Sequence, residues 1–353
     1  MKTAFTFALL ALVGGTTLGT DYAKERALKI ETDYQVAMET VESSMERDGQ
    51  PVEGRGMGGG KSDSTWHIVQ VDEVQSHEGK KPTKVKRTYE KVGGERNFSM
   101  GDTDRKSDLE SPFEGATLQL TGEGENVKVE FLEGKKPDHE GALEGHRLEL
   151  ALDALLPDKD VEKDAHWDLD AAQIKRALGL DLRKALYPPP PAPEGAGGGG
   201  GGGGGGRRGG MGRGGGGGGI PADAEWTGKA KLVSLDEEVD GQKCAKVEIQ
   251  IGAHGDLPEQ AMGGGGRGRM FEPESALPFF ASTYSVEAKG EFYFSLDSKR
   301  PVKLELEGTQ EIVVDREMKR EESTMKMHSK QQGKLKVKIA VSEEAKAKDA
   351  KAK

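Results

Sequence analysis

The sequence is poor in cysteine, in aromatic residues and in long apolar runs. It has one cysteine, Cys244, among 353 residues, so no disulfide can form within the chain. Aromatic residues make up 5% and hydrophobic residues 34%, which is enough for only a thin core. No segment is apolar for long enough to cross about 30 Å of hydrocarbon as a helix. The fold must therefore depend on burial of apolar side chains and on backbone hydrogen bonds.

The first residues have the order of a secretory leader. Lys2 supplies a positive charge, 4–13 is a short apolar run, and small or polar residues follow. We expect a signal peptide at 1–19, with cleavage after Gly19, and an exported protein that is periplasmic or extracellular. A bacterial lipid anchor would need a cysteine directly after the cleavage point. Cys244 lies far downstream, in an alternating segment that favours a plain strand thiol over a nucleophile.

Glycine is concentrated in three tracts that carry arginine and methionine. The tracts are 54–58, 195–219 and 262–270, and none of them can bury apolar surface, so we expect them to be disordered. Patterns such as GxGxxG arise in these runs by composition and do not indicate a nucleotide site, because no βαβ context surrounds them. The longest tract follows four prolines, 188–191, and together they predict a disordered linker at 188–220.

Three arginines of the linker, Arg207, Arg208 and Arg213, have no acidic neighbour within the tract. Arginine–glycine segments bind single-stranded RNA through charge and stacking. Export would separate the chain from cytosolic RNA, and the tract has no aromatic residue to stack on bases. The remaining interpretations are contact with an anionic envelope surface and a plain flexible linker, of which the linker is favoured.

Outside the tracts, apolar and polar residues alternate with a period of two. The longest examples are 284–296, 302–314 and 325–341, and the turn at 297–301 predicts that the first two pair as a hairpin. Shorter examples occur at 28–38, 127–131, 148–152 and 245–251. Each has one polar face, which is typical of antiparallel sheets with one side in water.

One helix is predicted at 170–186, where Asp170 and Gln173 can form a capping box and the prolines end the helix. The expected fold is mainly β, with antiparallel meanders forming two lobes or a curled half-barrel and one short amphipathic helix. The expected organisation is an N-terminal lobe at 20–169, a helix at 170–187, the linker, a C-terminal lobe at 221–342 and a charged tail at 343–353.

Catalytic and metal-binding patterns are scarce. HExxH, GxSxG and paired-cysteine motifs are absent, and the seven histidines have no ligand spacing. Asp102, Asp104 and Asp108 have part of the spacing of a calcium loop, but Lys106 occupies a ligand position and Ser107 replaces the glycine. We therefore expect a protein that is not an enzyme and has no cofactor and no metal site.

Several short segments resemble known secreted proteins. A turn at 48–51, a segment at 83–87, Val161 and Trp167 resemble a group of uncharacterised secreted β-rich proteins of planctomycete-type bacteria, although 164–166 reads Asp-Ala-His where that group often has Gly-Asp. The long meander with its turn at 297–301 looks like the half-barrel lipoprotein-carrier fold, whose concave face holds acyl chains.

These observations predict an exported, non-catalytic envelope protein with a binding or structural role. The alternative is a periplasmic carrier of lipid or lipoprotein acyl chains, and a hydrolase is a distant third. The expected partner is an envelope component, either protein or lipid, and nucleic acid is not expected.

Overall fold

The computed structural model describes residues 15–23, 27–52, 59–124, 126–137, 141–187, 224–256, 279–320 and 323–344. The linker predicted at 188–220 and the glycine tracts at 54–58 and 262–270 lie outside these residues. The elements are β1 (Ala27–Arg47), β2 (Gln50–Pro51), β3 (Gly60–Glu78), β4 (Lys81–Met100), β5 (Thr103–Glu110), β6 (Thr117–Glu123), β7 (Asn126–Glu133), the 3-10 helix η1 (Ala151–Leu155), β8 (His166–Leu169), α1 (Ala171–Ala177), α2 (Leu180–Leu186), β9 (Glu225–Val239), β10 (Gln242–Asp256), β11 (Phe279–Ser295), β12 (Arg300–Arg320) and β13 (Ser323–Glu344).

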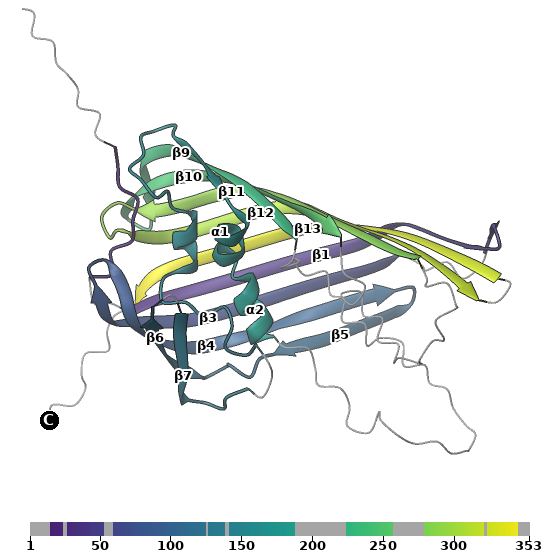
Figure 1. The fold of residues 1–353 in the computed structure, drawn as a ribbon, viewed down its shortest axis with the longest axis horizontal. Helices are drawn as coiled ribbons and strands as arrows, with labels where there is room; N and C mark the ends of the chain where they lie inside the picture. The colour runs from purple at the N-terminus through teal and green to yellow at the C-terminus, as the bar shows by residue number, and fades with distance from the viewer. Residues whose placement is uncertain are drawn as a thin grey trace, which may run out of the picture.

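One large antiparallel sheet contains all thirteen strands (Figure 1). Its main path is β7-β6-β4-β3-β1-β13-β12-β11-β10-β9-β8, with β2 beside β1 and β5 beside β4. The two halves of the sequence meet in the middle of the sheet, where β1 pairs with β13 from Ala27 opposite Glu344 to Arg47 opposite Met325. The predicted antiparallel β class is confirmed, and a single open sheet joins what the sequence suggested as two lobes.

The alternating pattern correctly identifies the buried face of the long strands. Phe292 and Phe294 are fully buried, whereas Tyr293 between them is half-buried and its hydroxyl donates to Glu291. Charged residues on the opposite face form cross-strand pairs, such as Lys336 with Glu307 at 2.8 Å. The polar alternate positions are thus the wet face of the sheet.

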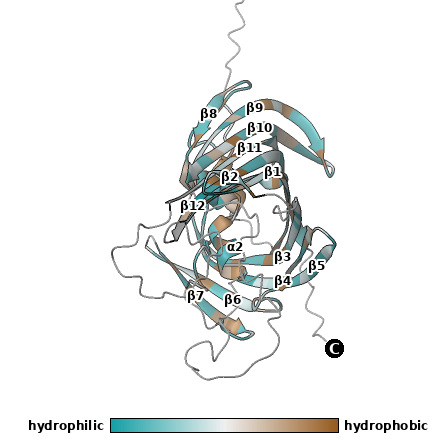
Figure 2. Cartoon of the chain, turned by 90° about the vertical axis from the view of Figure 1, so that its right-hand side faces the viewer, coloured by the Kyte–Doolittle hydropathy of each residue, from teal (hydrophilic) through white to brown (hydrophobic). Residues whose placement is uncertain are grey.

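The sheet curves around the helices, so that α2 lies on its concave side (Figure 2). Glycines inside long strands permit close approach of the backbones where the strands bend. A Cβ on Gly290 would lie 1.8 Å from the carbonyl oxygen of Glu305, and one on Gly308 would lie 2.2 Å from that of Glu287. Any side chain at these positions would push neighbouring strands apart.

Two sequence predictions about local structure are wrong. The helix expected at 170–186 is two short helices, α1 and α2, because Gly179 adopts a left-handed conformation with φ 56° and interrupts the first helix. The predicted capping box of Asp170 and Gln173 is confirmed. The strand expected at 148–152 is a loop leading into η1, since the amide of Leu150 donates to the Tyr22 hydroxyl and not to a neighbouring strand.

Candidate functional site

The arginines singled out in the sequence, Arg207, Arg208 and Arg213, lie outside the residues that the structure describes. The structure instead draws attention to the concave face of the sheet. There, α1 and α2 cover the middle strands, and we call these two helices the lid. The sequence did not identify the residues of this face as a site.

The lid is held against the sheet by polar contacts from its second half. The Tyr34 hydroxyl on β1 donates to the carbonyl of Leu178, and burial raises the pKa of Tyr34 to about 12. The Arg183 guanidinium on α2 lies 5.5 Å from the centre of the Tyr34 ring and 5.1 Å from that of Trp66. Just after α2, the Tyr187 hydroxyl donates to the carbonyl of Gly93 at 2.9 Å. These contacts fix one end of the lid on β1, β3 and β4.

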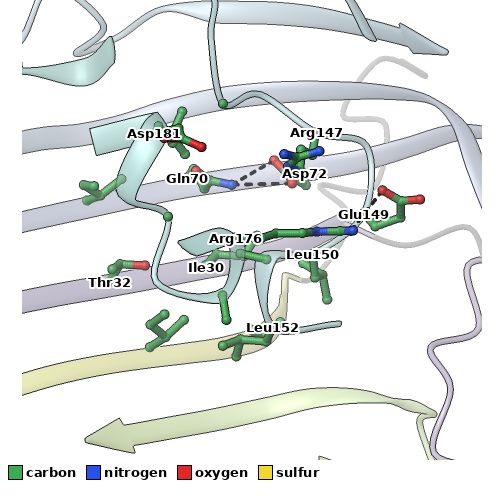
Figure 3. Close-up of a pocket in the computed structure, with 18 of the residues that line it drawn as sticks. Ile30, Thr32, Gln70, Asp72, Arg147, Glu149, Leu150, Leu152, Arg176 and Asp181 are labelled. Carbon is green, nitrogen blue, oxygen red and sulfur yellow. Dashed lines mark hydrogen bonds and ion pairs between the residues drawn. The ribbon is translucent and has the colours of Figure 1, made fainter. Parts of the chain in front are cut away.

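A small cavity of about 80 Å³ lies between the lid, the sheet and the loop that precedes η1 (Figure 3). We call it the lid pocket. Its lining includes aliphatic side chains from the sheet, the loop and the lid, and charged or amide side chains gathered on one side. The lining includes Ile30, Thr32, Ile68, Gln70, Asp72, Arg87, Arg147, Glu149, Leu150, Leu152, Lys175, Arg176, Asp181, Ile339 and Val341.

The floor of the lid pocket is largely aliphatic, with Thr32 and Gln70 among the aliphatic side chains that three neighbouring strands present in register. Ile30 on β1 is opposite Val341 on β13. Two residues further along β1, Thr32 is opposite both Ile339 on β13 and Ile68 on β3. The aliphatic members of this set are all at least 90% buried. An apolar chain lying along this floor would contact β3, β1 and β13 together.

A buried ion pair forms the polar wall of the lid pocket. The Arg87 guanidinium donates from Nε and Nη2 to the two carboxylate oxygens of Asp72, at 2.7 Å each, and also to the Arg147 carbonyl at 3.2 Å. Gln70 approaches the same carboxylate at 3.4 Å. Burial by itself lowers the pKa of Arg87, but the charge of Asp72 and its hydrogen bonds outweigh burial and raise that pKa. The Asp72–Arg87 pair is therefore a fixed structural feature in which each charge already has its partner.

The mouth of the lid pocket is charged and more exposed. Arg176 on α1 reaches across to Glu149, with Nη2 3.1 Å from the carboxylate oxygen (Figure 3). Asp181 on α2 also lines the pocket, together with Lys175 and Arg147. Charges at the mouth above an aliphatic floor give the pocket an amphipathic lining.

A second, larger hollow of about 1,040 Å³ lies further along the same strands. It touches β1, β3, β4, β9, β10, β11, β12 and β13, and we call it the cross-strand hollow. Its lining mixes apolar side chains with charged ones, which include the ion pair of Lys61 with Glu39 at 3.0 Å as well as Glu287, Glu311 and Lys334. A volume of this size lies at the top of the range for small-molecule sites, about 300 to 1,000 Å³.

The residues with catalytic potential are separated from one another. Cys244 on β10 is fully buried, and burial raises the pKa of its thiol, which disfavours the reactive thiolate. His67 pairs with Asp33 at 2.6 Å and His328 with Asp315 at 2.8 Å, both on the wet face of the sheet. These pairs are cross-strand neighbours in register. The antiparallel pairing therefore explains their proximity without catalysis.

Over the part of the chain that the structure describes, no group of three or more histidine, cysteine, aspartate or glutamate side chains could hold a metal ion. Asp104, from the calcium-like pattern, lies in β5 and accepts a hydrogen bond from Ser99 of β4. In the same described ranges, no helix has the length and apolar character needed to cross a membrane.

Sequence comparison gives no relative from which a function could be taken. No protein-family model matches the chain, and no curated protein matches it.

Proposed function

We propose that this chain is a non-catalytic binding protein whose ligand carries an acyl-type apolar chain, held between the concave face of the sheet and the lid. The fold is then best described as an open half-barrel, as in carriers of lipid or lipoprotein acyl chains. The observation that carries the proposal is the lid pocket, in which aliphatic side chains of the sheet lie beneath two short helices and charged side chains stand at the mouth. Apolar sites with a few placed polar groups are the usual form of ligand pockets.

The lid pocket is small in this structure. One water needs about 10 to 15 Å³ of such volume, so a cavity of about 80 Å³ holds only several waters. A long chain would therefore enter only if the lid moves away from the floor. Gly179 between the two helices and Gly145 in the facing loop both have positive φ, at 56° and 73°, and lie at the joints where such a movement would turn.

The cross-strand hollow favours a second candidate, the binding of a polar polymer or protein segment in the envelope. The hollow is already large and carries charges of both signs, so it requires no lid movement. It would serve the binding or structural role that the sequence predicts, without a lipid ligand.

The absence of enzymatic activity and the exported location are part of the same proposal. Burial of Cys244 and the in-register histidine pairs support a non-catalytic role. The leader-like order of the first residues supports export to the periplasm or the cell exterior. The expected partner is an envelope lipid or protein.

Titration with a fluorescent long-chain fatty acid tests the choice between the two sites. Ile339→Phe adds volume to the floor of the lid pocket, and Ile249→Phe adds the same volume on the same sheet face outside the pocket. We expect Ile339→Phe to weaken binding at least tenfold and Ile249→Phe to leave it unchanged. Both variants are first checked for a cooperative unfolding transition, because overpacking is destabilising in each.

A variant of the cross-strand hollow completes the comparison. Ala253→Phe adds a large side chain to the lining of that hollow. Loss of fatty-acid binding in Ala253→Phe, with normal binding in Ile339→Phe, would show that the ligand binds in the cross-strand hollow. Saturable hydrolysis of an ester, glycan or peptide panel would contradict the non-catalytic proposal.

A further inference from the structure

The segment from Thr16 to Tyr22 is packed into the fold as a strap. Leu18 is 3% exposed and Tyr22 is 5% exposed, and both belong to the main hydrophobic core. Thr16 forms a two-way β-bridge with Val161, with N···O distances of 2.7 and 3.1 Å. A segment that is removed on export would not be expected to contribute core side chains.

Polar contacts tie the strap to two separate parts of the molecule. The Tyr22 hydroxyl donates to the carboxylate of Asp153 in η1, and Thr20 Oγ1 donates to the same carboxylate at 2.6 Å. The Tyr22 hydroxyl also accepts from the Leu150 amide at 2.6 Å. On the other side, the Asp21 amide donates at 2.9 Å to the carbonyl of Lys299, in the turn between β11 and β12.

The strap therefore connects η1 to the sheet. Leu150 and Leu152, which flank Asp153, line the lid pocket. A cut after Gly19 would remove Thr16 and Leu18. The backbone amide and carbonyl of Val161 would then lose their hydrogen-bond partners, and the core site of Leu18 would be empty. It would also place a new charged amine at Thr20, directly beside the buried carboxylate contact.

We propose that the strap is retained in the mature protein and that leader processing takes place at the Gly15–Thr16 bond or on its N-terminal side. A cut at that bond leaves the small residue Gly15 next to the cleaved peptide bond, as leader processing requires. The new ammonium group of Thr16 still donates to the Val161 carbonyl. This proposal shares with the proposed function only the assumption that the chain is exported.

N-terminal sequencing and intact-mass analysis test the cleavage position directly. The full chain, with its own leader, is expressed in a Gram-negative host and recovered from the periplasm. A mature protein beginning at Gly15 or Thr16 is the expected result. A mature protein beginning at Thr20 would overturn the proposal. Uncleaved chain in the periplasm would overturn the processing half of the proposal. Uncleaved chain confined to the cytoplasm would overturn the exported location as well, while ligand binding would be judged separately.

Two single variants of the full chain test the strap independently of export. Leu18→Ala removes a buried strap side chain, and Leu132→Ala removes a leucine that is 52% exposed on β7. We expect Leu18→Ala to raise the unfolded fraction by about thirtyfold or more in urea titrations, as for other buried leucines. Leu132→Ala should change it by a few fold at most. Equal small effects would show that the strap is not part of the folded core.

Discussion

His146 should make the fold sensitive to acid. Its side chain is 5% exposed and packs against Tyr89 and Phe113, with Nδ1 3.3 Å from the Tyr89 hydroxyl. Nε2 is buried without a hydrogen-bond partner among the described residues. Burial, and secondarily the charge of Arg87, lower the pKa of His146 from 6.5 to about 3. The effect is therefore measured by lowering the pH from 7 to 4 and comparing the stability of the wild type with that of His146→Phe.

The direction follows from proton uptake by the two states. Between pH 6.5 and 3 the unfolded chain binds a proton at this histidine and the folded protein does not, so the stability contributed by His146 falls as the pH falls. The full pKa difference corresponds to about 5 kcal/mol, of which about 3 kcal/mol is lost by pH 4. Replacement by phenylalanine removes this loss and also removes the unpaired buried nitrogen.

Asp153 acts in the opposite direction and has to be separated from this effect. Burial raises its pKa from 3.8 to about 6, against the lowering effect of hydrogen bonds from Thr20 and Tyr22. The folded protein then binds the extra proton, so its contribution is fully present below about pH 4 and is lost as the pH rises through about 6. The size is about 3 kcal/mol, similar to the loss at His146.

Urea denaturation at pH 7, 5.5 and 4 distinguishes the two groups. The free energy of unfolding of the wild type minus that of His146→Phe should fall by about 3 kcal/mol from pH 7 to pH 4. The same difference calculated with Asp153→Asn should change in the opposite sense. A wild-type curve that runs parallel to the His146→Phe curve would refute the argument that His146 is held neutral by burial.

Three further predictions concern the sheet. Asp72→Asn should cost about 3 to 5 kcal/mol in urea titrations, because it leaves the Arg87 charge buried without its partner, and a loss below about 1 kcal/mol would contradict the buried pair. Gly308→Ala should lower the melting temperature measured by circular dichroism, since its Cβ would meet a neighbouring backbone; an unchanged value would mean that the strands can separate freely. Phe292→Ala should cost about 3 to 5 kcal/mol and Tyr293→Ala much less, and equal losses would refute the assigned register.

The alternating residues predicted the strand class and burial well, because the side-chain period of a strand is set by its backbone. Phe292, Phe294, Leu304 and Val337 all lie on the buried face, as their spacing indicates. The pairing of β1 with β13 was not predicted. Alternation gives the face of each strand but not its partner across three hundred residues, and the glycine tract suggested two separate lobes.

The lid pocket could be predicted only in part, since its members come from distant segments. The capping box of Asp170 and Gln173 predicted the start of the helix, but the sequence did not predict its division at Gly179, where the backbone is left-handed. Asp72 and Arg87 carried a signal that sequence analysis did not use. They are charged residues opposite each other in a hairpin, on the face where neighbouring residues are apolar.

The proposed function depends most directly on whether an acyl chain occupies the space beneath the lid. Native mass spectrometry of the full chain, purified gently from the host periplasm, measures this. The predicted result is a wild-type protein carrying a bound species whose mass is that of an acyl lipid, with the species absent from Ile339→Phe and present on Ile249→Phe. Wild-type protein that is free of lipid, and that stays free when incubated with long-chain fatty acid, would contradict the proposed function.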